Sequence, residues 1–160
     1  MKIKAIHSLL NRLYEIAEAI EIELTKAVLR SNLGSYKNHY IKIGQEWYCQ
    51  KYYIPVLTVK KKGDIGVNID GIFFEAGLPV AKISKEKLQK IFKSLKGVEA
   101  YGFNHCMRSF WPSKNGISEV LSEMKASGEK TIQFSFNLPL KMLPRNVVKS
   151  FLRFSAVLAK

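Results

Sequence analysis

The chain has 160 residues, of which 47% are hydrophobic and 24% are charged, and its formal net charge at pH 7 is +13. A chain of this size and composition builds an ordinary core, which excludes intrinsic disorder and low complexity. Two cysteines exclude a disulfide scaffold, and no apolar run reaches the roughly 18 residues of a membrane span, so we expect a cytoplasmic protein with no membrane association.

The first predicted element is a long helix over residues 3–30. Its apolar residues recur at alternating spacings of four and three, which is typical of a helix with one buried seam. The seam comprises Ile6, Leu10, Leu13, Ala17, Ile20 and Leu24. Such a seam either covers a sheet of its own domain or packs against a second copy, and the sequence leaves both alternatives open.

Three strands follow, and we predict them over residues 40–43, 47–59 and 65–74, which are rich in aromatic and β-branched residues. Pro55 indicates that the second strand lies at an edge or bends there. Gly71 is typical of a bulge in the third strand. Their short connections favour antiparallel pairing.

The second half alternates helices and strands. Ser84 is the expected cap of the first of these helices and Gly97 its end, and Pro144 opens the last helix. The predicted elements are a helix to Lys96, a strand over 98–103, a loop over 104–116, a short helix near 117–126, a strand over 130–138 and a C-terminal helix.

The fold class that follows is α+β. We expect a mainly antiparallel sheet of about five strands, flanked by a long N-terminal helix, a middle helix and a C-terminal helix. The order of elements is α-β-β-β-α-β-(α)-β-α. Because neither a repeat nor a linker interrupts the pattern, we predict a single domain over residues 1–160.

This order of elements resembles the type III secretion chaperones, small homodimers in which helices flank a twisted sheet. The resemblance covers nearly the whole chain and rests on topology alone. It implies a homodimer that engages a protein or peptide partner. The chain departs from that family in charge, because those chaperones are acidic. Its lysine- and isoleucine-rich sequence is also similar to small uncharacterised archaeal proteins.

Positive charge is concentrated in residues 81–160, which carry fifteen basic and five acidic side chains. A surface of this kind attracts polyanions such as nucleic acid. The candidate contacts are Lys85, Lys93 and Lys96 on the middle helix and Arg145, Lys149 and Arg153 on the last. The alternative interpretation is a solvated helix face opposite the apolar one.

Residues 104–111 gather the side chains best suited to chemistry. His105 and Cys106 are a candidate base and nucleophile, and Arg108 is a candidate anion ligand. We favour a structural role, because the sequence shows no positioned base, and a buried cysteine packs as a small apolar residue. No nucleotide-binding, hydrolase or metal-ligand motif is present, so we expect neither a metal nor a cofactor.

These observations give three hypotheses for function. The first is a non-enzymatic, chaperone-like binding protein, homodimeric, that engages a protein or peptide. The alternative is a basic accessory protein that binds RNA or DNA. The second alternative is a small enzyme that uses residues 104–111.

Overall fold

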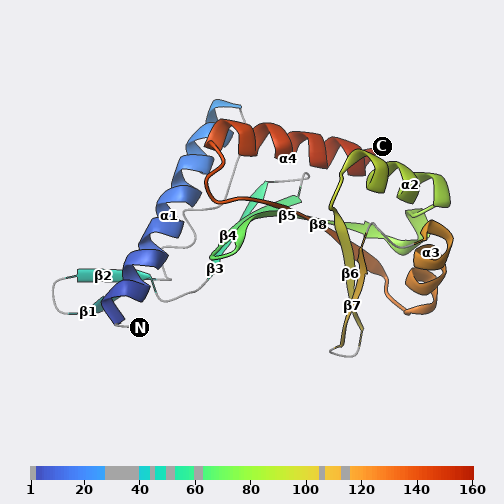
Figure 1. Ribbon diagram of the computed structural model, residues 1–160, viewed down its shortest axis with the longest axis horizontal. Coiled ribbons are helices and arrows are strands. Elements are labelled where there is room, and N and C mark those ends of the chain that lie inside the picture. Colours follow the sequence, from blue (N-terminus) through green and yellow to red (C-terminus); the bar gives the residue numbers. More distant parts are fainter. Residues whose placement is uncertain are drawn as a thin grey trace. The chain divides into compact units, whose positions relative to one another are not determined.

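The computed structural model describes residues 3–27, 40–43, 46–49, 53–59, 63–104, 107–112 and 116–160. In these residues the protein is α+β, as expected, with helices at both ends of the chain (Figure 1). The helices are α1 (Ile3–Lys26), the short 3-10 helix η2 (Val80–Lys82), α2 (Lys85–Ser94), α3 (Ile117–Ala126) and α4 (Pro144–Ala159). The strands are β1 (Tyr40–Ile43), β2 (Glu46–Cys49), β3 (Tyr53–Val59), β4 (Gly63–Asn68), β5 (Gly71–Pro79), β6 (Glu99–Asn104), β7 (Met107–Pro112) and β8 (Thr131–Leu138). No helix in the described ranges is long and apolar enough to span a membrane.

The predicted helices are confirmed, and their ends differ by a few residues. Helix α3 has the predicted bounds, and α4 begins at Pro144. Helix α2 ends at Ser94 instead of Lys96, and Gly97 follows with a left-handed φ of 84°, which favours glycine. The described part of α1 ends at Lys26, and residues 28–39, where we expected its last turn, lie outside the described residues.

The prediction of three strands in residues 40–74 was wrong, because two of the apolar runs each contain two strands. The run over 47–59 divides into β2 and β3, which belong to different sheets. The run over 65–74 divides into β4 and β5 at Ile69 and Asp70. There the Asn68 side-chain oxygen accepts hydrogen bonds from the amides of Asp70 (2.8 Å) and Gly71 (3.0 Å), a local turn that stops the strand.

The predictions made from one glycine, Gly71, and one proline, Pro55, had different outcomes. Gly71 does not lie inside one long third strand, as we expected, since it is the first residue of β5. Pro55 was interpreted correctly: β3 is an edge strand, and its register with β4 shifts between Ile54 and Leu57. The predicted loop over 104–116 is also corrected, because half of it is strand β7, which pairs antiparallel with β6.

The strands form a two-stranded sheet, β1-β2, and a six-stranded sheet of order β3-β4-β5-β8-β6-β7. Pairs β3–β4, β6–β7 and β6–β8 are antiparallel. Strand β5 also runs antiparallel to β8, because the Val80 amide after β5 bonds the Lys130 carbonyl before β8 (3.1 Å). The described residues therefore hold eight strands in two separate sheets, where we expected about five strands in one sheet.

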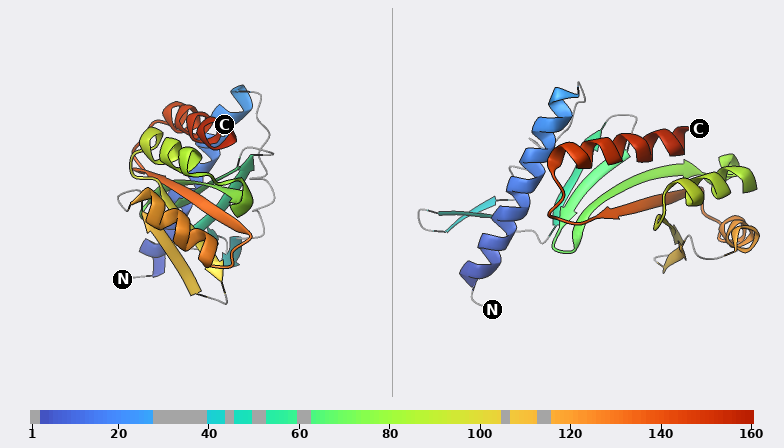
Figure 2. Two further views of the ribbon diagram at one scale, coloured as in Figure 1. Left: turned by 90° about the vertical axis from the view of Figure 1, so that its right-hand side faces the viewer. Right: turned by 45° about the horizontal axis from the view of Figure 1, so that its top comes forward.

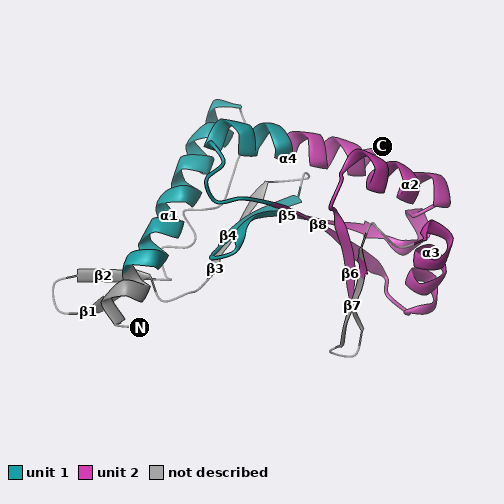
Figure 3. Ribbon diagram, in the orientation of Figure 1, with its two compact units in different colours: residues 1–73, 138–150 teal, residues 74–137, 151–160 magenta. Residues whose placement is uncertain are grey.

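The chain divides into two compact units (Figure 3). Unit 1 comprises residues 1–73 and 138–150, and unit 2 comprises residues 74–137 and 151–160. Strands β5 and β8 and helix α4 each contribute residues to both units. The single domain expected from the sequence stays a prediction.

In unit 1, helix α1 packs on strands β2, β3 and β4 of its own chain. Its seam is buried there: Leu10, Leu13, Ala17, Ile20 and Leu24 are at most 3% exposed. The side chain of Ile6 lies outside the described residues. The apolar face that suggested either a sheet contact or a second copy is therefore occupied within the chain.

In unit 2, the sheet buries one face under helices, and the core centres on Phe74. Its ring lies 5.3 Å from that of Phe151, 5.8 Å from that of Phe154 and 6.2 Å from that of Phe136, measured between ring centroids. The C-terminal end of α4 lies next to an end of α2 in both views of Figure 2. Aromatic contacts at these distances stabilise a core beyond the area that they bury.

Candidate nucleic-acid interface

Helix α2 carries the highest density of positive charge in unit 2. Five lysines and one glutamate lie between residues 85 and 96. Its apolar stripe is buried, with Leu88 and Ile91 at 0% and Phe92 at 7% exposure. Burial of this stripe fixes the helix on unit 2 and leaves the opposite side in solvent.

The lysines on the solvent side lie on one arc of the helix. At 3.6 residues per turn, Lys85, Lys90 and Lys93 lie within an arc of roughly 140° around the axis, and Lys96 follows two residues after the helix ends at Ser94. All four are exposed. In the described part of the chain none of them forms an ion pair with a carboxylate. Their charge is therefore available to a partner.

Arg153 of α4 extends this arc. Its Nη2 donates a hydrogen bond to the carbonyl oxygen of Ser94, in the last turn of α2 (3.1 Å). The last carbonyls of a helix have no partner within it, and a cation there also complements the helix dipole. We define the basic face as Lys85, Lys90, Lys93, Lys96 and Arg153, all of which belong to unit 2.

The start of α2 is fixed by Ser84. Its hydroxyl oxygen accepts a hydrogen bond from the Lys87 amide at 3.1 Å, which satisfies one of the free donors of the first turn. The pKa of the exposed Glu86 is lowered, first by a hydrogen bond from its own backbone, then by one from the Ser84 hydroxyl and by the charge of Lys85.

Replacing this cap should have two measurable effects. We expect Ser84→Ala to lower the free energy of unfolding by about 1 kcal/mol. The same change should raise the pKa of Glu86, because one of the hydrogen bonds to its carboxylate is lost. Urea unfolding measures the first effect and NMR titration the second. Ser122→Ala, at an exposed position inside α3, is the control and should change neither; an unchanged stability in Ser84→Ala would contradict the assigned cap.

Arg145 and Lys149 are also exposed on α4, where four-residue spacing places them on the same helix face as Arg153. They belong to unit 1, so they are not counted in the basic face. Of the six predicted contacts, the structure thus groups Lys85, Lys93, Lys96 and Arg153. The sequence-based set omitted Lys90, which counting positions around the helix would have added.

The sheet face away from the helices holds a polar pair. The Tyr101 hydroxyl donates a hydrogen bond to Glu75 Oε1 at 2.5 Å, and Tyr101 is 3% exposed. Tyr101 is directly opposite Gln133 in the ladder between β6 and β8. A carboxylate held by a buried phenol in this way links β5 to β6 across the intervening strand β8 and needs no ligand to explain it.

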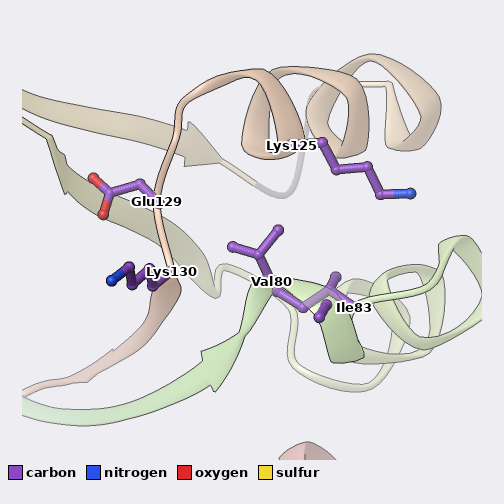
Figure 4. A pocket seen from close by; sticks show the side chains of 6 residues that line it. Val80, Ile83, Lys125, Glu129 and Lys130 are labelled. Atoms are coloured by element: carbon purple, nitrogen blue, oxygen red, sulfur yellow. The ribbon is translucent and has the colours of Figure 1, made fainter.

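A cleft of about 510 Å³ opens beside η2 and the segment between α3 and β8 (Figure 4). It is lined by Val80, Ala81, Ile83, Lys125, Glu129 and Lys130. In Figure 4 the charged ends of Lys125, Glu129 and Lys130 lie apart and do not meet over Val80 and Ile83. Catalytic sites bring such groups together, so this arrangement gives no support for chemistry in the cleft.

The candidate catalytic segment stays untested. His105 and Cys106 lie outside the described residues, and so does the side chain of Arg108, whose backbone is in β7. The end of β7 is structural: Trp111 is 3% exposed, and its Nε1 donates to Glu123 Oε2 of α3 at 2.8 Å. Among the described residues no group of three His, Cys, Asp or Glu side chains is placed to hold a metal.

Comparison with known proteins places this architecture in a family. The model of a family described as "Protein of unknown function (DUF3201)" matches residues 5–149. The chain belongs to this family. Among solved structures, a conserved hypothetical protein from Pyrococcus furiosus is similar, with a TM-score of 0.69, 23% identity, and 98% of this chain and 96% of that chain covered. A search of curated proteins finds no match.

At 23% identity the Pyrococcus furiosus structure shows a shared fold only. It agrees with the similarity to small archaeal proteins noted in the sequence. The resemblance to type III secretion chaperones rested on a predicted order with about five strands, whereas the described residues of this DUF3201 protein hold eight.

Proposed function

We propose that this DUF3201 protein binds nucleic acid through the phosphate backbone, which it contacts with the basic face of unit 2. The observation that carries the proposal is the group of exposed lysines on α2 and directly after its end, none paired with a carboxylate in the described chain, extended by Arg153. Cations that replace the counterions of phosphates provide most of the affinity of sequence-independent binding.

The chemistry of the basic face favours backbone contacts over base recognition. Four of its five members are lysines, which act as flexible point charges and lack the rigid two-donor fork by which arginine recognises its partners. Arg153 already donates to the Ser94 carbonyl. We therefore expect similar affinities for oligonucleotides of different sequence.

An anionic membrane is a weaker candidate for the partner. Helices that lie on membranes insert an exposed apolar face, with lysines along its rim. The apolar residues of α2 are instead buried in unit 2, where Leu88, Ile91 and Phe92 are at most 7% exposed. The helix has nothing apolar left to insert.

Salt dependence tests the proposal directly. If three to five phosphates are contacted, the slope of log K against log salt on duplex DNA should be about −2.7 to −4.5. Between 50 and 200 mM KCl, affinity should fall by about 40-fold to about 500-fold. Fluorescence anisotropy with a labelled duplex measures this. Absence of binding at 50 mM, or binding that salt does not weaken, would refute the proposal.

A competition experiment separates nucleic acid from acidic protein. Unlabelled duplex should displace the labelled duplex at a lower charge concentration than polyglutamate does, because phosphates on a rigid duplex are more densely spaced than carboxylates on a flexible chain. Equal competition by polyglutamate would identify the basic face as a surface for acidic polypeptides and would end the nucleic-acid proposal.

A homodimer that binds a protein or peptide is the second candidate. The seam of α1 no longer supports it, because the described seam residues are buried against the same chain. What favours a dimer is a different feature: in the described part of the chain, strand β7 of unit 2 ends the sheet and pairs with β6 alone.

A further inference from the structure

Strand β7 is the last strand of the six-stranded sheet. In the described part of the chain its only ladder partner is β6, which pairs with it over its full length, from Glu99↔Pro112 to Asn104↔Met107. An edge strand presents a row of backbone donors and acceptors that another strand can pair with.

The register shows which backbone groups of β7 face outward. Asn104 and Met107 are paired with two residues between them, and the pair that closes such a short connection exchanges backbone hydrogen bonds. Because hydrogen-bonded and non-hydrogen-bonded pairs alternate along an antiparallel ladder, the next residues of β7 that bond to β6 are Ser109 and Trp111. The backbone groups of Arg108 and Phe110 therefore point away from β6.

The two edges of this sheet differ in how they are protected. Edge β3 contains Pro55 and a register shift between Ile54 and Leu57, two features that block the approach of another strand. Strand β7 has one charged residue, Arg108, and its single proline is Pro112, the last residue. Among the described residues, β7 is therefore the edge of the sheet that has neither a second ladder partner nor a feature that blocks one.

We infer that β7 pairs antiparallel with β7 of a second copy, so that the protein is a dimer whose sheets are joined edge to edge. A second copy fits this edge because an antiparallel pair of identical strands is self-complementary about a twofold axis. Pairing of β7 with a partner's β3 would build an open chain of copies, and the Pro55 edge blocks it. The inference does not depend on the proposed nucleic-acid binding.

The dimer has a consequence for the basic face. Both β7 and the basic face belong to unit 2, so pairing at β7 ties two basic faces into one assembly. A long nucleic acid that reaches both faces gains avidity without any new contact.

Two proline variants test the interface. Light scattering after size exclusion, at about 50 μM, should give twice the chain mass for the wild type. Phe110→Pro and Arg108→Pro each remove one outward amide without removing a bond to β6, so both should give the mass of the monomer. Lys93→Glu, which leaves the backbone of β7 unchanged, is the control and should stay dimeric.

Hydrogen exchange on the wild type covers the case in which the proline variants do not fold. The amides of Arg108 and Phe110 should be protected in the dimer, and their exchange should accelerate on dilution below the dissociation constant. A wild type that is monomeric at 50 μM would overturn the inference. So would folded proline variants that remain dimeric, or unprotected amides at these two positions.

Discussion

Reversing two charges on the basic face should weaken nucleic-acid binding and flatten its salt dependence. In Lys93→Glu/Lys96→Glu we expect the slope of log K against log salt to become shallower by about 1.8, because two phosphate contacts are lost. Affinity for duplex DNA at 100 mM KCl should fall by roughly 10-fold or more, since each new carboxylate also repels phosphate. Both lysines are exposed and unpaired in the described chain, so the fold should be unaffected.

The matched control places the same change in charge on the other unit. Arg12 of α1 and Lys141 before α4 are exposed and belong to unit 1, and Arg12→Glu/Lys141→Glu alters net charge equally. This variant should retain the wild-type slope. If both double variants lost affinity equally, binding would reflect net charge alone, and the basic face would not be the site. Arg153 is unsuitable for this test because its loss also removes a hydrogen bond to α2.

Truncation of Phe74 should cause the largest loss of stability. The residue is fully buried, and its ring contacts those of Phe136, Phe151 and Phe154. We expect Phe74→Ala to lower the free energy of unfolding by about 3–5 kcal/mol, from lost burial and the cavity that remains. Urea unfolding followed by circular dichroism measures it, and a single cooperative transition in the wild type would support the one-domain prediction.

A conservative variant shows whether the loss comes from the cavity. Phe74→Leu keeps most of the apolar volume, so it should cost less than half as much as Phe74→Ala. An exposed apolar residue, Leu143, gives the comparison: Leu143→Ala should change stability by less than about 0.5 kcal/mol. A loss below about 1 kcal/mol for Phe74→Ala would mean that the aromatic cluster is not the core of unit 2.

Helices were predicted better than strands because their signals are local. Ser84, Gly97 and Pro144 mark helix ends by their own backbone chemistry, and the periodicity of α1 identified the residues that are buried. Apolar runs of strand residues carry no such end marks. The turn at Asn68 depends on side-chain hydrogen bonds to Asp70 and Gly71, which an Asn-Ile-Asp-Gly sequence suggests only weakly.

The candidate site was predictable in part. Exposure of Lys85 and Lys93 follows from their positions outside the buried stripe of α2, and Lys96 is exposed just beyond the end of that helix. The proximity of Arg153 to that helix was not predictable, because 59 residues separate it from Ser94 and only packing brings them together. The open edge at β7 was hidden for the same reason, since the segment was predicted to be a loop.

The sequence by itself determined the fold class, the positions of the helices and the sign of the charge, all of which depend on composition and on contacts between near neighbours. Three features were decided by the tertiary structure alone. The seam of α1 is buried against strands of the same chain, certain lysines lie close to Arg153, and β7 is the last strand of the sheet. These depend on pairings between distant segments, whose choice is made by the packing of the whole core and leaves no local pattern.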